Sequence, residues 1–179
     1  KVETAKNELR SAKANGDPVE IAKAQANLDS ARQGLAVANK GMNKVNSDNK
    51  VSEAQANVAK AESELKKAQA SGNKAQVAKA KGKLQAANDN LNNVKAQANE
   101  TLAKDDVKSA QASVAAATSA LSVAKESGNA TDIKSAQSNL TKAKDNLSTA
   151  EAQSNVVKAS NAVSSAKEEL RRAEASGQG

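Results

Sequence analysis

The sequence predicts an all-α protein: an elongated antiparallel coiled coil, or three-helix bundle, of long Ala-rich helices with heptad repeats. Apolar residues recur at alternating intervals of three and four, which is the spacing of a coiled-coil seam. Four similar glycine strings, at residues 14–17, 70–73, 126–129 and 175–178, have their glycines 56, 56 and 49 residues apart. These distances are whole numbers of heptads, so the seam keeps its phase across each string.

The composition favours long, thin helices over a thick-cored globule. The chain has 179 residues, of which 40 are alanine and none is aromatic. Alanine has the highest helix propensity but buries little surface. No apolar run is long enough to span a bilayer, and no signal peptide is visible. Because Lys1 begins within a repeat, we expect the chain to be a fragment of a longer protein.

The first helices are predicted as a short stub at residues 2–14 and a long arm at residues 18–70. The stub has its seam at Val2, Ala5, Leu9 and Ala12, and the Gly16 turn follows. Glycine just past the last seam residue can take the left-handed conformation that ends a helix. Asp17 can then cap the next helix, and Pro18 suits its first position because no hydrogen bond to its nitrogen is needed there.

Two further arms are predicted at residues 75–126 and 130–175, with turns at Gly72 and Gly128. Asn73 and Asn129 follow these glycines and are expected to cap the next arm. Mid-helix Gly34, Gly41 and Gly82 lower the expected stability. The predicted seams of these two arms and of the second half of the first arm are listed here: Val51, Ala54, Val58, Ala61, Leu65, Ala68; Val77, Ala80, Leu84, Ala87, Leu91, Val94; Val107, Ala110, Val114, Ala117, Leu121, Ala124; Ile133, Ala136, Leu140, Ala143, Leu147, Ala150; Val156, Ala159, Val163, Ala166, Leu170, Ala173.

Folding the chain back at its glycines matches large residues to small ones, as close antiparallel packing requires. Around Gly72, Leu65 meets Ala80 near the turn, and much farther out Leu28 meets Ala117 and Leu35 meets Ala110. Around Gly128, the pairing continues out to Leu170 with Ala87. We therefore predict one elongated repeat domain over residues 1–179.

Each arm contains one phase break, where a seam interval is six residues. The breaks fall at residues 46–50, 104–106 and 151–155. An interval of six is a stammer, which overwinds a continuous coiled coil locally. The alternative is a second set of turns at these junctions. The junctions contain neither glycine nor proline, so long helices are favoured and the alternative stays open.

The sequence predicts no catalytic, cofactor-binding or metal site, no cofactor, and a protein that is not an enzyme. It has no His and no Cys, so the usual metal ligands and nucleophile–base pairs are missing. Its carboxylates are expected at outward heptad positions, far from the buried pocket that acid catalysis needs. Those considered are Glu62, Glu64, Asp89, Asp145, Glu168 and Glu169.

The charge pattern limits the partners that can be expected. The net charge is +7, but the lysines are spread among polar residues. Without clustered basic residues or stacking aromatics, nucleic-acid binding is not expected, and neither is membrane insertion. A host or cell-wall component remains a candidate partner, and self-association remains open.

Residues 64–73 and 84–91 (Glu-Leu-Lys-Lys-Ala-Gln-Ala-Ser-Gly-Asn and Leu-Gln-Ala-Ala-Asn-Asp-Asn-Leu) resemble the alanine-rich helical repeats of Gram-positive bacterial cell-wall surface proteins, especially adhesins. The resemblance covers nearly the whole chain and rests on repeat style, without a site motif. It implies a secreted protein at the bacterial cell surface, in which the repeats form a stalk that projects a binding region from the cell wall. The alternatives are a helical ligand-binding module that contacts a host or wall component through one helix face, and an intracellular or desiccation-related helical protein.

Overall fold

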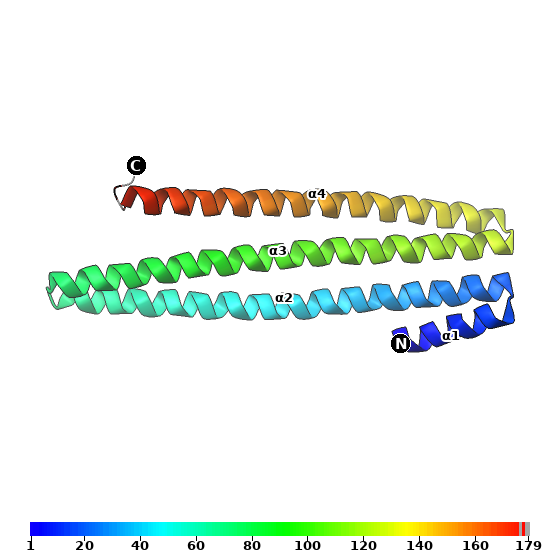
Figure 1. Ribbon diagram of the computed structural model, residues 1–179, viewed down its shortest axis with the longest axis horizontal. Coiled ribbons are helices and arrows are strands. Elements are labelled where there is room, and N and C mark those ends of the chain that lie inside the picture. Colours follow the sequence, from blue (N-terminus) through cyan, green and yellow to red (C-terminus); the bar gives the residue numbers. More distant parts are fainter. Residues whose placement is uncertain (176, 178–179) are drawn as a thin grey trace. The chain divides into compact units, whose positions relative to one another are not determined.

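The computed structural model describes residues 1–175 and Gly177. These residues form four helices and no strand: α1 (Val2–Asn15), α2 (Pro18–Ala70), α3 (Lys74–Ser127) and α4 (Ala130–Ala175) (Figure 1). The all-α class is thereby confirmed, and the helix bounds differ by at most one residue from those predicted. The single elongated domain over 1–179 stays a prediction.

The corners between the helices form as the local sequence indicates. Gly16, Gly72 and Gly128 have φ of 80°, 68° and 69°, in the left-handed region. After each glycine, the side-chain oxygen of the next residue accepts hydrogen bonds from the first turn of the following helix. Asn73 Oδ1, for example, accepts from the backbone N of Ala75 at 3.0 Å and of Gln76 at 3.1 Å. Asp17 and Asn129 cap their helices in the same way.

The three phase breaks lie inside continuous helices. Residues 46–50 belong to α2, residues 104–106 to α3 and residues 151–155 to α4. The preference for long helices over a second set of turns is therefore confirmed. The absence of glycine and proline at these junctions explains it, because nothing there interrupts the backbone hydrogen bonds.

The chain divides into two compact units, of which unit 1 contains residues 1–41 and 103–179 and unit 2 contains residues 42–102. In unit 1, three polar contacts join α2 to α3. Ser119 Oγ donates to Asp29 Oδ2 at 2.6 Å, Gln33 Nε2 donates to Ser113 Oγ at 2.9 Å, and Lys40 forms an ion pair with Asp106. Partner numbers fall as α2 advances, so the two helices are antiparallel there.

In unit 2, one ion pair fixes the register of the same two helices. Lys83 Nζ lies 2.7 Å from Glu64 Oε2. The two residue numbers add up to 147, and in the three contacts of unit 1 they add up to 146 or 148. Each unit therefore pairs α2 with α3 in the register expected from the Gly72 corner, to within a few residues.

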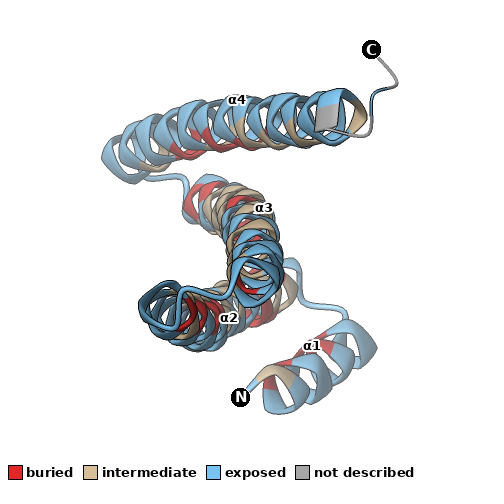
Figure 2. Cartoon of the chain, turned by 90° about the vertical axis from the view of Figure 1, so that its left-hand side faces the viewer, coloured by how far each residue is buried: buried red, intermediate tan, exposed pale blue. Residues whose placement is uncertain are grey.

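The core is thin and made mostly of alanine. Ala54, Ala61, Ala68 and Ala80 are buried in unit 2, while no large side chain in the described residues is fully enclosed. In unit 1, the buried cluster comprises Ala5, Leu9 and Ala12 of α1 with Ala24 and Leu28 of α2. Figure 2 shows the buried residues as narrow stripes along helices that are otherwise exposed.

The pairing of the first half of α2 corrects one sequence prediction. Its apolar seam was expected to face α3, with Leu28 against Ala117 and Leu35 against Ala110. Instead Ala24 and Leu28 pack on α1, and Leu35 is 49% exposed. The side of α2 that contacts α3 carries Asp29, Gln33 and Lys40. A helix can offer different stripes to different neighbours, and α1 takes the apolar one here.

The second half of α4 corrects another. Val156, Val163 and Leu170, with Ala166, were expected in the seam, but the three larger residues are 68%, 54% and 60% exposed. The buried stripe that includes Leu140 and Ala150 continues to Ser154 instead. Since α4 is helical throughout and advances about 100° per residue, the interval of six turns the later apolar residues to roughly the opposite side. The expected contacts of Leu170 and Ala166 with α3 are therefore wrong.

Candidate functional site

The carboxylates that the sequence singled out are spread along three helices. Glu62, Asp145 and Glu169 are exposed, and Glu64, Asp89 and Glu168 are half-buried. Asp89 accepts a hydrogen bond from Gln85 at 2.6 Å, and Glu168 pairs with Arg172 one turn along α4. The structure therefore does not gather these six residues into one site.

Glu64 is the carboxylate whose titration is visibly perturbed. The hydrogen bond from Lys83 lowers its pKa below the ordinary value of 4.5, and the positive charge of Lys83 lowers it further. Lys60 and Lys67 add smaller effects in the same direction. A lowered carboxyl pKa keeps the group ionised, which suits an ion pair between helices and opposes a role as a general acid.

A buried polar network around Asp29 escaped the sequence analysis. Asp29 is 5% exposed and accepts hydrogen bonds from Gln25 at 2.8 Å and from Ser119 at 2.6 Å. Arg32, one turn later, lies 3.4 Å from its other oxygen. All partners are donors, so the network holds one ionised carboxylate and leaves no second group positioned for proton transfer. Its evident effect is to join α2 to α3.

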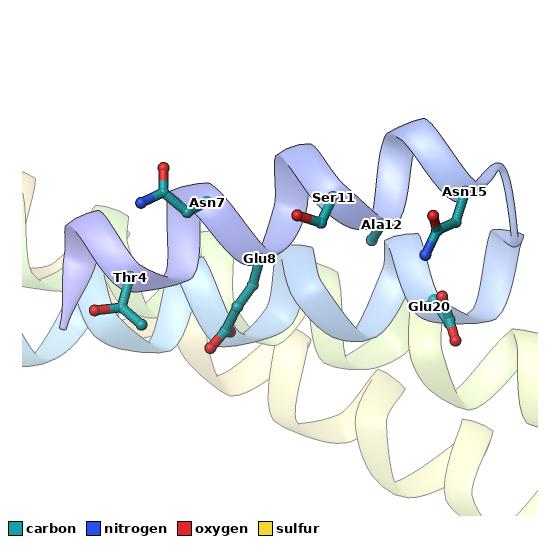
Figure 3. Close-up of a pocket in the computed structure, with 7 residues that line it drawn as sticks. All are labelled: Thr4, Asn7, Glu8, Ser11, Ala12, Asn15 and Glu20. Atoms are coloured by element: carbon teal, nitrogen blue, oxygen red, sulfur yellow. The ribbon is translucent and has the colours of Figure 1, made fainter.

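The hollows of unit 1 lie along α1. The larger, of about 510 Å³, is lined by six residues of α1 and by Glu20 of α2. In the close-up, Glu8 and Glu20 point from different helices, and the other polar groups, among them Asn7 and Asn15, spread along the outside of α1 (Figure 3). All of its lining side chains except Ala12 are exposed. A ligand there would stay in contact with water, so the hollow offers little to bind it.

Two further searches of the described residues gave nothing that indicates a cofactor or a membrane span. Within residues 1–175 and Gly177, no three His, Cys, Asp or Glu side chains come together as metal ligands. None of the helices in that part of the chain has a stretch apolar and long enough to cross a bilayer.

The outer stripe of α4 is the most distinctive surface of unit 1. We give this name to Val156, Ala159, Val163, Ala166 and Leu170, all of which are exposed. They follow one another at intervals of three and four, so they share one side of the helix. Three large apolar side chains in one row are unusual on a surface that is otherwise Lys, Gln, Asn and Ser. The sequence showed this row, but its phase break did not reveal which side it would face.

Comparison with known proteins gives one partial match. Residues 39–93 match the family described as "Protein of unknown function (DUF1090)". This segment holds the second half of α2, the Gly72 corner and the first part of α3. No match was found among curated proteins or among solved structures. Because the matched segment is less than a third of the chain and its family carries no assigned activity, the comparison adds no function to the geometry.

Proposed function

We propose that this chain is a non-catalytic structural spacer, the stalk repeat of a bacterial surface protein that projects a binding region from the cell wall. In this proposal, α2, α3 and α4 form an elongated antiparallel coiled coil. The observation that carries it is the constant register between α2 and α3, whose contacting residue numbers add up to 146–148 both near the Gly72 corner and far from it.

The composition of the contacts also supports a spacer. Buried residues are mainly alanine, which lets helix backbones approach closely along their length but makes no deep core. Each corner is a glycine followed by a capping residue, so a helix ends and the next begins within a few residues. Such units add length at low cost in sequence complexity, and they need no binding site of their own.

Small-angle X-ray scattering tests the shape on which this function depends. α2 has 53 residues, which at 1.5 Å per residue make about 80 Å of helix. We expect the pair-distance distribution of the isolated chain to be that of a rod, with a maximum dimension of at least that length. A compact, near-spherical particle would contradict the proposal.

A display experiment tests the spacing function directly. A reporter domain is anchored to a Gram-positive cell wall either through this chain or without it. We expect an antibody to label the reporter more strongly when the chain is present, because the chain carries it farther from the wall. A flexible linker of 179 residues serves as the control for added length alone. Equal labelling by all three designs would contradict a spacer.

One observation favours a second candidate, a helical ligand-binding module that contacts a host or wall component through one helix face. The outer stripe of α4 is an exposed apolar row of the kind such a module would use. The stripe has no Trp, Tyr or Phe, the residues that most often supply binding energy at interfaces. Binding of purified wall or host extracellular matrix that is lost in Leu170→Asp would favour this candidate over the spacer.

A further inference from the structure

The outer stripe of α4 has a close counterpart inside the same chain. Residues 2–17, which contain α1, and residues 163–178 are identical at nine of sixteen positions when aligned without gaps. The alignment places Val2 on Val163 and Leu9 on Leu170, and Gly16 on Gly177. Both glycines have a left-handed φ, of 80° and 73°. The end of α4 is therefore a second copy of the α1 sequence, followed by the same kind of corner.

The two copies differ in what covers them. In α1, Ala5, Leu9 and Ala12 are only 5–8% exposed because they pack on Ala24 and Leu28 of α2. In α4, the matching Val163 and Leu170 are 54% and 60% exposed. Within unit 1, the same apolar row is thus seen once on its acceptor and once with its large side chains in water. This comparison shows what kind of surface the uncovered row fits.

The charges beside the row are retained as well. Lys6, Glu8 and Arg10 of α1 align with Lys167, Glu169 and Arg171 of α4. A helix end that carries the same apolar residues and the same flanking charges offers the same face to α2. Since electrostatic mismatch is what usually separates related helical partners, nothing in this pattern distinguishes the end of α4 from α1 as a partner for α2.

We propose that the outer stripe of α4 docks on α2 of a second copy of this chain, in the place that α1 takes within one copy. Antiparallel pairing in the α1 register sets Leu170 against Ala24, Ala166 against Leu28 and Val163 against Ala31. The row on α4 is longer than α1, and the same register continues with Ala159 against Leu35. Every pair joins a large residue to a small one. Leu35, 49% exposed in the single chain, is thereby covered.

The geometry of this contact is head-to-tail. The donating surface is the end of α4 and the accepting surface is the first half of α2, so the two are different surfaces of one chain. Such heterologous contacts form rings or open chains of copies. The proposal goes beyond the spacer role and does not depend on it, because it rests on the row and its acceptor alone.

Within one copy, α1 competes for the acceptor. It is tethered through the Gly16 corner, and a short tether gives an effective concentration of roughly millimolar or more. We therefore expect the unaltered chain to be mostly monomeric at micromolar concentrations. Detaching α1 should release the acceptor and promote association, which makes the competition itself measurable.

The test uses three full-length variants and sedimentation velocity over a concentration series. Leu9→Asp places a charge in the α1 row and should detach α1, so that association begins at a concentration about tenfold lower than in the unaltered chain or less. Adding Leu170→Asp to this variant should abolish the gain, because the donor row then carries a charge too. Ser11→Asp adds the same charge to an exposed position of α1 and should behave like the unaltered chain.

The double variant separates the proposed contact from general stickiness of an exposed α2. If Leu9→Asp associates and the double variant associates equally, the α4 row is not the donor and the proposal fails. If Leu9→Asp stays monomeric while circular dichroism shows its helix content largely kept, the acceptor does not take α4 and the proposal fails as well.

A peptide probe keeps the proposal testable if Leu9→Asp loses much of its helix. A fluorescently labelled peptide of residues 153–177 is titrated with the unaltered full chain at high concentration, and anisotropy reports binding. We expect binding that a peptide with Leu170→Asp does not show and that an unlabelled peptide of residues 1–16 competes away. Absence of binding up to millimolar chain, or competition by a peptide of residues 1–16 with Leu9→Asp that is equally strong, would overturn the assignment.

Discussion

Asp29 shows at the scale of one residue how this thin structure fixes its register. Its carboxylate is 5% exposed and accepts from Ser119 across the α2–α3 contact of unit 1. Replacing it by alanine leaves the buried Ser119 hydroxyl without this acceptor. We expect Asp29→Ala to lower the free energy of unfolding by about 1–3 kcal/mol, measured by urea denaturation followed at 222 nm.

Two comparisons isolate the hydrogen bond. Ser119→Ala removes the donor, and the double variant should recover part of the loss because neither partner is then left unsatisfied. Asp145→Ala removes an exposed carboxylate from α4 and should change stability by less than about 0.5 kcal/mol. Equal effects at positions 29 and 145 would show that the network has no special weight.

Glu64 provides a pH-dependent counterpart in unit 2. Lys83 lowers the pKa of Glu64 below 4.5 in the folded state, so the folded protein binds the ionised form more favourably. The stabilisation is therefore fully present above pH 4.5 and is lost as the pH falls through the lowered pKa. Thermal unfolding should separate the unaltered chain from Glu64→Gln more at pH 7 than at pH 3. A separation that grows on acidification would contradict this.

At the scale of elements, two glycines of unit 2 have opposite roles. Gly72 forms a corner with φ of 68°, whereas Gly82 lies inside α3 with no heavy atom within 4 Å of an added Cβ. Alanine strains the left-handed corner but favours the helix. We expect Gly72→Ala to lower the melting temperature and Gly82→Ala to raise it, each by about 1 kcal/mol of stability or less. The same shift in both would refute the assigned backbone roles.

The elements also show what the sequence could and could not predict. Helices, corners and caps depend on residues within one or two turns, such as Gly72 and Asn73, and they follow from the sequence. The choice of neighbour does not. Leu28 matches Ala117 of α3 as well as Ala5 of α1 by size, so pattern alone cannot decide between them. Once α1 covers this row, the adjacent side of α2 faces α3, and Asp29 becomes buried.

The same limit applies to the end of α4. The interval of six before Val156 is compatible with an overwound helix, which would keep the apolar row inside, and with a regular helix, which turns it outward. The sequence contains the break but not the energetic balance between the two. In the structure the helix remains regular and the outer stripe is exposed. The most distinctive surface therefore arose where the sequence pattern was ambiguous.

At the scale of the whole chain, the α2–α3 register yields a prediction about length. Residues 54–60 of α2 and 87–93 of α3 are two heptads whose numbers pair to 147, as Glu64 and Lys83 do. Deleting both should preserve every remaining pair and the helix phase. Deleting residues 54–60 alone shifts the contacts beyond them by seven residues, which is about 10 Å along a helix.

The absence of cysteine makes this shift easy to detect. Gln33 and Ser113, joined by a 2.9 Å hydrogen bond, are replaced by cysteine and treated with a short thiol cross-linker. We expect cross-linking in the full chain and in the paired deletion, and a strong loss in the single deletion, since position 33 then lies opposite position 106. A single deletion that still cross-links 33 to 113 would mean that the register near Asp29 is set locally. The Gly72 corner would then not determine it, and the length of a spacer built this way could not be changed by whole heptads.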